Sequence, residues 1–543
     1  MATRRRPGTR AQTATLVAAS LGFGMIQLDV TVVNVAVKQI GASFGGGITG
    51  LQWVVSSYTL VLASLILTAG SLGDRFGAKR VLCTGFVVFV TASVVCGFSV
   101  TMGMLIAARA VQGLGAALLG SCSLALVNHA FTDPGERSRA IGKWVAGASA
   151  ALSGGPVVGG ILIALFGWRA IFFINGPIGA AGFWLAWRYA AETGRSADRR
   201  VDTRGAVLAT AALAVFAAAV IEAGTYGFGS PWVLGGLGAA LAAAGAFVLA
   251  EARAANPMLP MSLFRRRGFV SPVTVGFGVN VCFYGLIFLF SLLFQARQRM
   301  SALETGLAFL PMTAAILGAN LVSGRASAVL GAGRTILAGL AAMLAGCAGL
   351  LWVGQATGYP ALLVQQILLG GGLGLLVPPM TAQLMSSADS GRSGVTSGAF
   401  TALRQAGSLL GVALFGSLAA TDFYGGFRAA LWISIAILVV GAVGAWLPAR
   451  APFSMNATHR RKRPTSATGN DYSPASGQIH RRERHGFRIC GFAEGHRRRR
   501  DDLRVPGRQC RARSSALRRP SARSESACQR GPVPAATCGQ PLG

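Results

Sequence analysis

Two charged side chains lie inside apolar stretches of this sequence, and they are the residues best placed to do chemistry. Asp29 lies in the run 28–37, and Arg109 lies in a second run close to Gly113 and Gly115. An ionised side chain costs about 2.5–3.5 kcal/mol at the centre of a membrane, so each must face water or an opposite charge. Asp29 is therefore a candidate proton-binding group, and either Asp29 or a carbonyl oxygen in a water-filled cavity is the expected partner of Arg109.

Helical periodicity adds a third polar group to this pair. Gln112 follows Arg109 by three positions, so the two side chains share one helix face. Two structural interpretations explain the same residues: an ion pair that only holds helices together, and a hydrogen-bonded carboxyl that only fixes their packing.

A dense charge cluster occupies the short connection between the apolar runs 51–69 and 81–100. It contains Gly70, Asp74, Arg75, Gly77 and Arg80. A connection this short between two membrane-spanning helices must turn tightly at the membrane surface, where glycine permits close backbone approach. The basic residues favour the cytoplasmic side for this turn.

A third pattern combines a helix-bending proline with glycines that allow another helix to approach. It consists of Gly155, Pro156, Gly159 and Gly160. Proline within a spanning helix is tolerated and often marks a bend. A packing groove without a role in transport remains the alternative.

The composition predicts an all-α polytopic membrane protein as the setting for these residues. The 543 residues are 52% hydrophobic and 13% charged, with a mean hydropathy of +0.53. This excludes an ordinary soluble domain, whose charged fraction is about 25%. The nine cysteines show no metal-ligand spacing, and no phosphate-binding loop of the G-x-x-x-x-G-K-[ST] type occurs.

Apolar runs of spanning length divide the chain into two sets of six expected helices with two more between them. The expected regions are a cytoplasmic N-terminus (1–12), a six-helix bundle (13–190), a linker with two helices (191–268), a second six-helix bundle (269–450) and a basic tail (451–543). Fourteen crossings put both termini on the cytoplasmic side. The Lys and Arg bias of the short loops agrees with that orientation.

A weak internal repeat supports two related halves. Gly70, Gly77 and Arg80 recur with the same spacing as Gly324, Gly331 and Arg334, and both segments follow the second helix of a six-helix set.

The tail cannot bury a core and is expected to be disordered, because it is polar and carries 20 of the 50 Lys and Arg residues. Nucleic-acid binding is not expected. A functional tail and a frame-shifted extension both fit its composition.

The successive motifs at 28–37, 70–80, 109–117, 155–160 and 168–179 resemble those of the fourteen-helix drug:proton antiporter branch of the major facilitator superfamily. The resemblance implies a proton-coupling role for Asp29 and Arg109. It implies a conformational switch at Gly70, Asp74, Arg75, Gly77 and Arg80, and at Gly155, Pro156, Gly159 and Gly160. One departure is Lys38, which stands where a proline usually ends the first-helix motif.

The function expected from the resemblance is proton-coupled export of amphipathic drugs or antibiotics across a bacterial plasma membrane, by a monomer without metal or cofactor. Its partners are a small lipophilic substrate, protons and the lipid bilayer. Export of an endogenous metabolite or amino acid is one alternative, and a transport-inactive sensor or scaffold is a second. No catalytic residue is expected. Candidate cavity residues are Gln27, Asn34, Gln112, Asn280, Phe283, Tyr284, Phe288 and Gln405.

Overall fold

The computed structural model describes residues 9–449, except 46, 195–201, 255–256 and 387–392. The predictions for residues 1–8 and for the tail from 451 onward lie outside these residues. The described residues form helices and connections without a strand. The prediction of an all-α polytopic protein is therefore confirmed.

The first half of the described chain consists of seven α-helices. They are α1 (Thr9–Phe44), α2 (Gly47–Phe76), α3 (Ala78–Gly97), α4 (Met102–Ala130), α5 (Pro134–Phe166), α6 (Ala170–Phe173) and α7 (Asn175–Tyr189). The short α6 and the longer α7 together correspond to the expected sixth span.

Two linker helices and a second set of helices follow. They are α8 (Thr203–Tyr226), α9 (Pro231–Arg253), η1 (Met261–Arg265), α10 (Arg267–Leu292), η2 (Leu293–Arg297), α11 (Ala302–Ala308), α12 (Leu310–Leu330), α13 (Ala332–Leu350), η3 (Tyr359–Leu362), α14 (Leu363–Ser386), α15 (Ser393–Leu418) and α16 (Phe423–Ala449). Here too one expected span, at 306–329, is divided between two helices, α11 and α12.

Within the described residues, thirteen helical segments are long and apolar enough to cross a membrane. The expected span at 395–419 is not among them, although α15 covers it with 26 residues. This helix carries Arg404 and Gln405 and packs between α10, α2 and α8. The polar side chains of Arg404 and Gln405 lie near the middle of this span and lower its mean hydropathy.

The two turns of the internal repeat have the same backbone conformation. Gly77 joins α2 to α3 with φ 99° and ψ 130°, and Gly331 joins α12 to α13 with φ 84° and ψ 152°. Side chains other than glycine rarely adopt this region of φ. The shared glycine spacing therefore reflects a shared turn between the second and third spans of each half.

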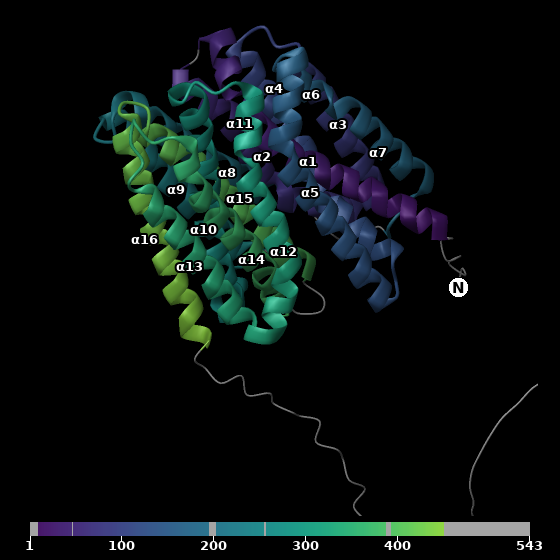
Figure 1. Ribbon diagram of the computed structural model, residues 1–543. Helices are drawn as coiled ribbons and strands as arrows, with labels where there is room; N and C mark the ends of the chain where they lie inside the picture. Colours follow the sequence, from purple (N-terminus) through teal and green to yellow (C-terminus); the bar gives the residue numbers. More distant parts are fainter. Residues whose placement is uncertain (1–8, 46, 195–201, 255–256, 387–392, 450–543) are drawn as a thin grey trace, which may run out of the picture. The chain divides into compact units, whose positions relative to one another are not determined.

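Helix contacts separate two halves that α8 and α15 connect. Within the first half, α1 packs on α5 and α4 packs on both α2 and α3; in the second, α10 packs on α15 and α14 packs on both α12 and α13. The crossing of α1 over α5 is visible in Figure 1. Helix α8 contacts both α2 and α15, and α9 packs against α8. The two linker helices, α8 and α9, therefore pack along the boundary between the two halves.

Glycines bring the two halves together where α5 meets α11. A Cβ atom at Gly160 would lie 2.8 Å from the Ala302 carbonyl oxygen, and one at Gly306 would overlap the Pro156 carbonyl. On the other face of α5, a Cβ at Gly159 would lie 3.2 Å from a Val32 methyl group of α1. Small residues let helix backbones approach closely in lipid, so this part of α5 fits between α1 and the second half.

Replacing Gly160 by alanine should destabilise the protein, because α5 and α11 must separate to make room for the new methyl group. Gly154→Ala on the same helix is the matched control, since a Cβ there meets no atom within 4 Å. The control should be neutral or up to about 1 kcal/mol more stable, the usual gain from removing a helical glycine. Thermal unfolding of both variants in detergent measures the difference. Equal stability of the two variants would contradict the close contact.

Candidate proton-coupling site

The site is built around an ion pair within the first half. The Asp29 carboxylate on α1 accepts a hydrogen bond from the Arg109 guanidinium on α4. Both side chains are 1% exposed. Asp29, one of the two partners expected for Arg109, therefore contacts it in the structure.

Two amide side chains extend the ion pair into a hydrogen-bonded network. Gln112 accepts from Arg109 at 2.8 Å and donates to the second Asp29 oxygen at 2.9 Å. Asn175 of α7 donates to Ser93 of α3 at 2.9 Å and lies 3.4 Å from the same Asp29 oxygen. Gln112 also donates to Ser93 at 3.1 Å. Four helices thus contribute polar atoms to one buried network.

Helix α2 completes the surroundings of the arginine. Arg109 Nε donates to the Val54 carbonyl at 3.2 Å, and the guanidinium lies 4.2 Å from the centroid of the Tyr58 ring. A cation over an aromatic face gains electrostatic stabilisation, most strongly where water is excluded. Arg109 is therefore held by a carboxylate, an amide, a carbonyl and a ring at once.

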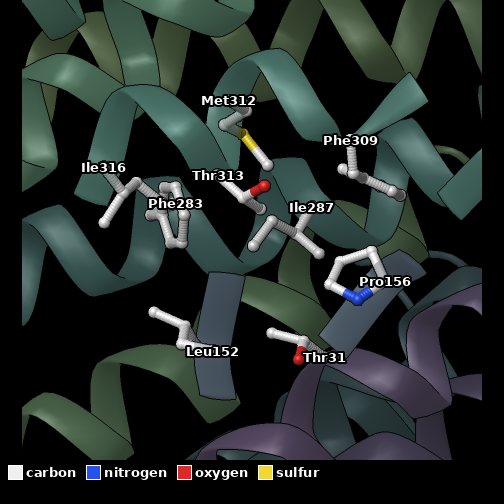
Figure 2. Close-up of a pocket in the computed structure, with 9 residues that line it drawn as sticks. All are labelled: Thr31, Leu152, Pro156, Phe283, Ile287, Phe309, Met312, Thr313 and Ile316. Atoms are coloured by element: carbon white, nitrogen blue, oxygen red, sulfur yellow. The ribbon is translucent and has the colours of Figure 1, made fainter. Parts of the chain in front are cut away.

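This network is buried within the first half and lines neither cavity between the halves. A central cavity of about 10 Å³ is the nearer of the two. Figure 2 shows its lining: Thr31, Leu152 and Pro156 face Phe283, Ile287, Phe309, Met312, Thr313 and Ile316. This volume is close to the minimum for one water molecule, so the halves are closed on each other here. Thr31 belongs to the same helix as Asp29, two positions further on.

Hydrogen bonds also join the halves nearer the end where α1 finishes at Phe44 and α2 begins, called the Phe44 end below. The Asn34 carbonyl accepts from Ser291 and, at 3.2 Å, from Gln295 of the second half. Gln52 of α2 donates to the Ala413 carbonyl of α15 at 2.7 Å. The structure is therefore a conformation in which the halves are joined at this end.

Comparison with known proteins identifies the family. The Major Facilitator Superfamily model matches residues 19–412. The chain belongs to the Major Facilitator Superfamily. It is 37% identical over 458 residues to the methylenomycin A resistance protein of Streptomyces coelicolor, covering 83% of this chain and 94% of that protein. It is 36% identical over 411 residues to the multidrug resistance protein Stp of Mycobacterium tuberculosis, covering 76% of each.

A solved structure shows the same fold at lower identity. The crystal structure of the human organic anion transporter MFSD10 (TETRAN) aligns with a TM-score of 0.57 and 17% identity, covering 81% of this chain and all of that chain. At this identity the likeness establishes the fold alone. The chain is thus a multi-pass membrane protein of the Major Facilitator fold, and the curated relatives named above are bacterial.

The switch residues expected from the family pattern lie in two places. Arg80 pairs with Glu192 at 3.6 Å on the surface, and the Glu192 carboxylate accepts from the Lys79 backbone at 3.2 Å. The Thr193 hydroxyl accepts from the Ala78 backbone at 2.8 Å. The segment after α7 therefore caps the start of α3. Asp74 and Arg75 are exposed, and Gly70 is half-buried.

The second group of expected switch residues consists of the glycine and proline residues of α5. Gly155 packs against Thr31 of α1, and Pro156 lines the central cavity with Thr31. Gly159 meets Val32, and Gly160 meets α11. The bend motif therefore lies at the contact of the two halves.

The candidate cavity residues are divided among different surroundings. Phe283 lines the central cavity, whereas Phe288 is fully buried in the core. Asn280 is buried and donates to the Gly276 carbonyl at 2.7 Å, and Tyr284 lies edge-on to Phe283. Asn34 takes part in the contact between the halves, and Gln112 takes part in the ion-pair network. Gln27 and Gln405 are half-buried.

Sequence reasoning did not single out Tyr58, Ser93, Asn175, Glu192 or Thr193. Asn175 lies within the motif at 168–179, but only the family resemblance drew attention to that motif. Tyr58 and Ser93 are ordinary polar residues in apolar runs, and only the packing of α2 and α3 against α4 shows what they contact. No cluster of potential metal ligands occurs among the described residues.

Arg109→Gln should lower the free energy of unfolding by about 3–5 kcal/mol, because it leaves the Asp29 carboxylate buried without its cation. Adding Asp29→Asn should recover most of that loss, since no buried charge remains. Arg80→Gln is the control: the Arg80–Glu192 pair is exposed, and such pairs contribute about 0–1 kcal/mol. Unfolding of the four proteins in detergent provides the measurement. A double variant no more stable than Arg109→Gln would contradict the pairing.

Proposed function

We propose that this transporter exports amphipathic drugs or antibiotics from the cytoplasm in exchange for protons. The buried Asp29–Arg109 pair is the observation that carries the proposal, because a carboxylate in this setting can bind a proton only if its ion pair changes. Support for the cargo comes from the relatives, whose names describe resistance to methylenomycin A and to multiple drugs. A tetracenomycin C resistance and export protein of Streptomyces glaucescens is 32% identical to the chain.

Protonation of Asp29 would change the contacts that its neighbours can make. Neutral Asp29 no longer attracts Arg109 as a carboxylate does, and the guanidinium then depends on Gln112, the Val54 carbonyl and the Tyr58 ring. Asp29 also ceases to be an acceptor on both oxygens, so the hydrogen bond from Gln112 must change. A local change of charge of this kind biases a switch between two packed states.

The first helix conveys that change to the contact between the halves. Three contacts originate within two turns of α1. Asp29 forms the ion pair, Thr31 lines the central cavity, and the Asn34 carbonyl accepts hydrogen bonds from the second half. Gly155 and Gly159 bring α5 against the same stretch of α1. A small rotation of α1 therefore alters all of these contacts together.

The basic-residue bias supports an orientation with both termini in the cytoplasm, in which the turn at Gly77 is also cytoplasmic. The Phe44 end then faces outward. The structure is a conformation closed at the outer side, and alternating access requires the Asn34–Gln295 contact to open. A proton entering down its gradient supplies about 1.4 kcal/mol for each tenfold difference in concentration.

Proteoliposomes containing the full chain test this proposal. An imposed pH gradient should drive accumulation of a cargo such as methylenomycin A or tetracenomycin C, and a protonophore should abolish it because the coupled proton flux is lost. Resistance of an efflux-deficient host that expresses the chain identifies which compound to use. Empty liposomes are the control for passive partition. Accumulation against a concentration gradient without a pH or voltage difference would rule out proton coupling.

A further inference from the structure

A second and larger cavity lies between the halves at the Phe44 end. Its volume is about 330 Å³, within the range of small-molecule pockets. The lining comes from α1, α2, α10, η2 and the start of α16: Val37, Lys38, Gly47, Ile48, Leu51, Ser291, Leu292, Gln295, Ala296, Arg297 and Phe423. It adjoins the hydrogen bonds between Asn34 and the second half, because Ser291 and Gln295 belong to both. We call it the outer cavity.

The polar amide of the outer cavity is already paired within the protein. Gln295 donates to Ser291 at 2.8 Å and to the Asn34 carbonyl at 3.2 Å, and it accepts from the Lys38 backbone at 3.3 Å. Val37, Leu51 and other apolar side chains form much of the remaining wall. The cavity therefore offers an apolar surface beside two cationic side chains.

Those cations have no carboxylate partner among the described residues. Lys38 is exposed, and Arg297 lies over the Phe423 ring at 5.2 Å. Neither takes part in the ion pairs of the described chain, which join Arg80 to Glu192 and Arg109 to Asp29.

Two acids near this end take part in helix capping. Asp422 accepts from the Gly425 backbone at 3.1 Å in the first turn of α16, and Glu304 forms a capping box with Ser301 at the start of α11. No acidic side chain lines the outer cavity in the described part of the chain. Its charge is therefore positive.

A third cation without a counter-charge lies deeper, on α15. Arg404 stacks over Phe400 at 5.5 Å, and its Nε is buried without a hydrogen-bond partner. The described residues give it no ion pair, in contrast to Arg109 of the first half. A buried guanidinium nitrogen without an acceptor favours a ligand that supplies one.

We propose that the cargo is an amphipathic organic anion, and that Lys38 and Arg297 bind its carboxylate in the outer cavity while the apolar wall holds its body. Arg404 provides an earlier station for the same group, between cytoplasm and exit. The direction of movement rests on the proposed export function; the binding preference does not. The inside-negative membrane potential would then itself favour outward movement of the cargo.

Equilibrium binding of a matched pair of probes tests this proposal. 2-Naphthoate and 2-naphthamide have the same ring system and differ in charge, and their fluorescence can be followed with the purified full chain in a neutral detergent. The wild type should bind the carboxylate about tenfold more tightly than the amide, as expected for charge-assisted hydrogen bonds. Added salt should reduce this preference.

Single substitutions assign the preference to the outer cavity. Lys38→Gln and Arg297→Gln should each weaken binding of naphthoate several-fold and leave binding of naphthamide unchanged, whereas Lys38→Arg should retain the preference. Arg428→Gln is the matched control, because Arg428 is an exposed cation on α16 that does not line the cavity. Arg404→Gln reports on the deeper station in the same assay.

Two results would overturn the proposal. One is equal affinity for both probes, or a preference that Arg428→Gln reduces as much as Lys38→Gln does. The other is loss of the preference in nanodiscs that contain phosphatidylglycerol, which would assign the cations to lipid headgroups. Because no gradient is present, these results are independent of proton coupling; failure of pH-driven transport alone would overturn the proposed function and leave the anion preference intact.

Discussion

The mutual dependence of Asp29 and Arg109 is the constraint on which the arrangement of the first half depends. Two charges that are 1% exposed are tolerated inside a membrane protein only when each satisfies the other. Their remaining hydrogen-bonding capacity is met by Gln112 of α4, with Ser93 of α3 and Asn175 of α7 behind it. The packing of α1, α3, α4 and α7 is therefore tied to the charge state of one carboxyl group.

Helix α1 connects this network to both cavities and to the contact between the halves. Along fewer than three turns it presents Asp29 to the ion pair, Thr31 to the central cavity, Asn34 to the second half and Lys38 to the outer cavity. The small residues of α5 hold it from one side. The ion pair lines neither cavity, so under the proposed function cargo and proton need not occupy the same place, and the position of α1 would couple them.

Much of the fold, and the pairing of Asp29 with Arg109, could be predicted from the sequence. Long apolar runs made the helices predictable, and a carboxylate and a guanidinium in such runs had few partners other than each other. The repeated glycine spacing also had a specific physical origin, the positive φ shared by Gly77 and Gly331. The position of α15 between α2, α8 and α10 could be established only from the structure.

Other features depended on packing across long sequence separations. Nothing local distinguishes Tyr58 or Ser93 from other polar residues of spanning helices, and Glu192 was assigned to a linker although it caps α3. Lys38 was visible only as a departure from the family pattern. Its role in a cationic cavity emerged when η2 and α16 were placed beside it. Spacing along the chain specifies which residues share a helix face, but not which face of another helix they meet.

The most direct test of the account is the number of protons released when cargo binds to the purified protein in a weakly buffered solution. The wild type should release protons, and Asp29→Asn should release none while still binding cargo. Glu136→Gln, which removes an exposed acid of α5, should behave like the wild type. Release from Asp29→Asn equal to that from the wild type would contradict the assignment of Asp29 as the coupling group.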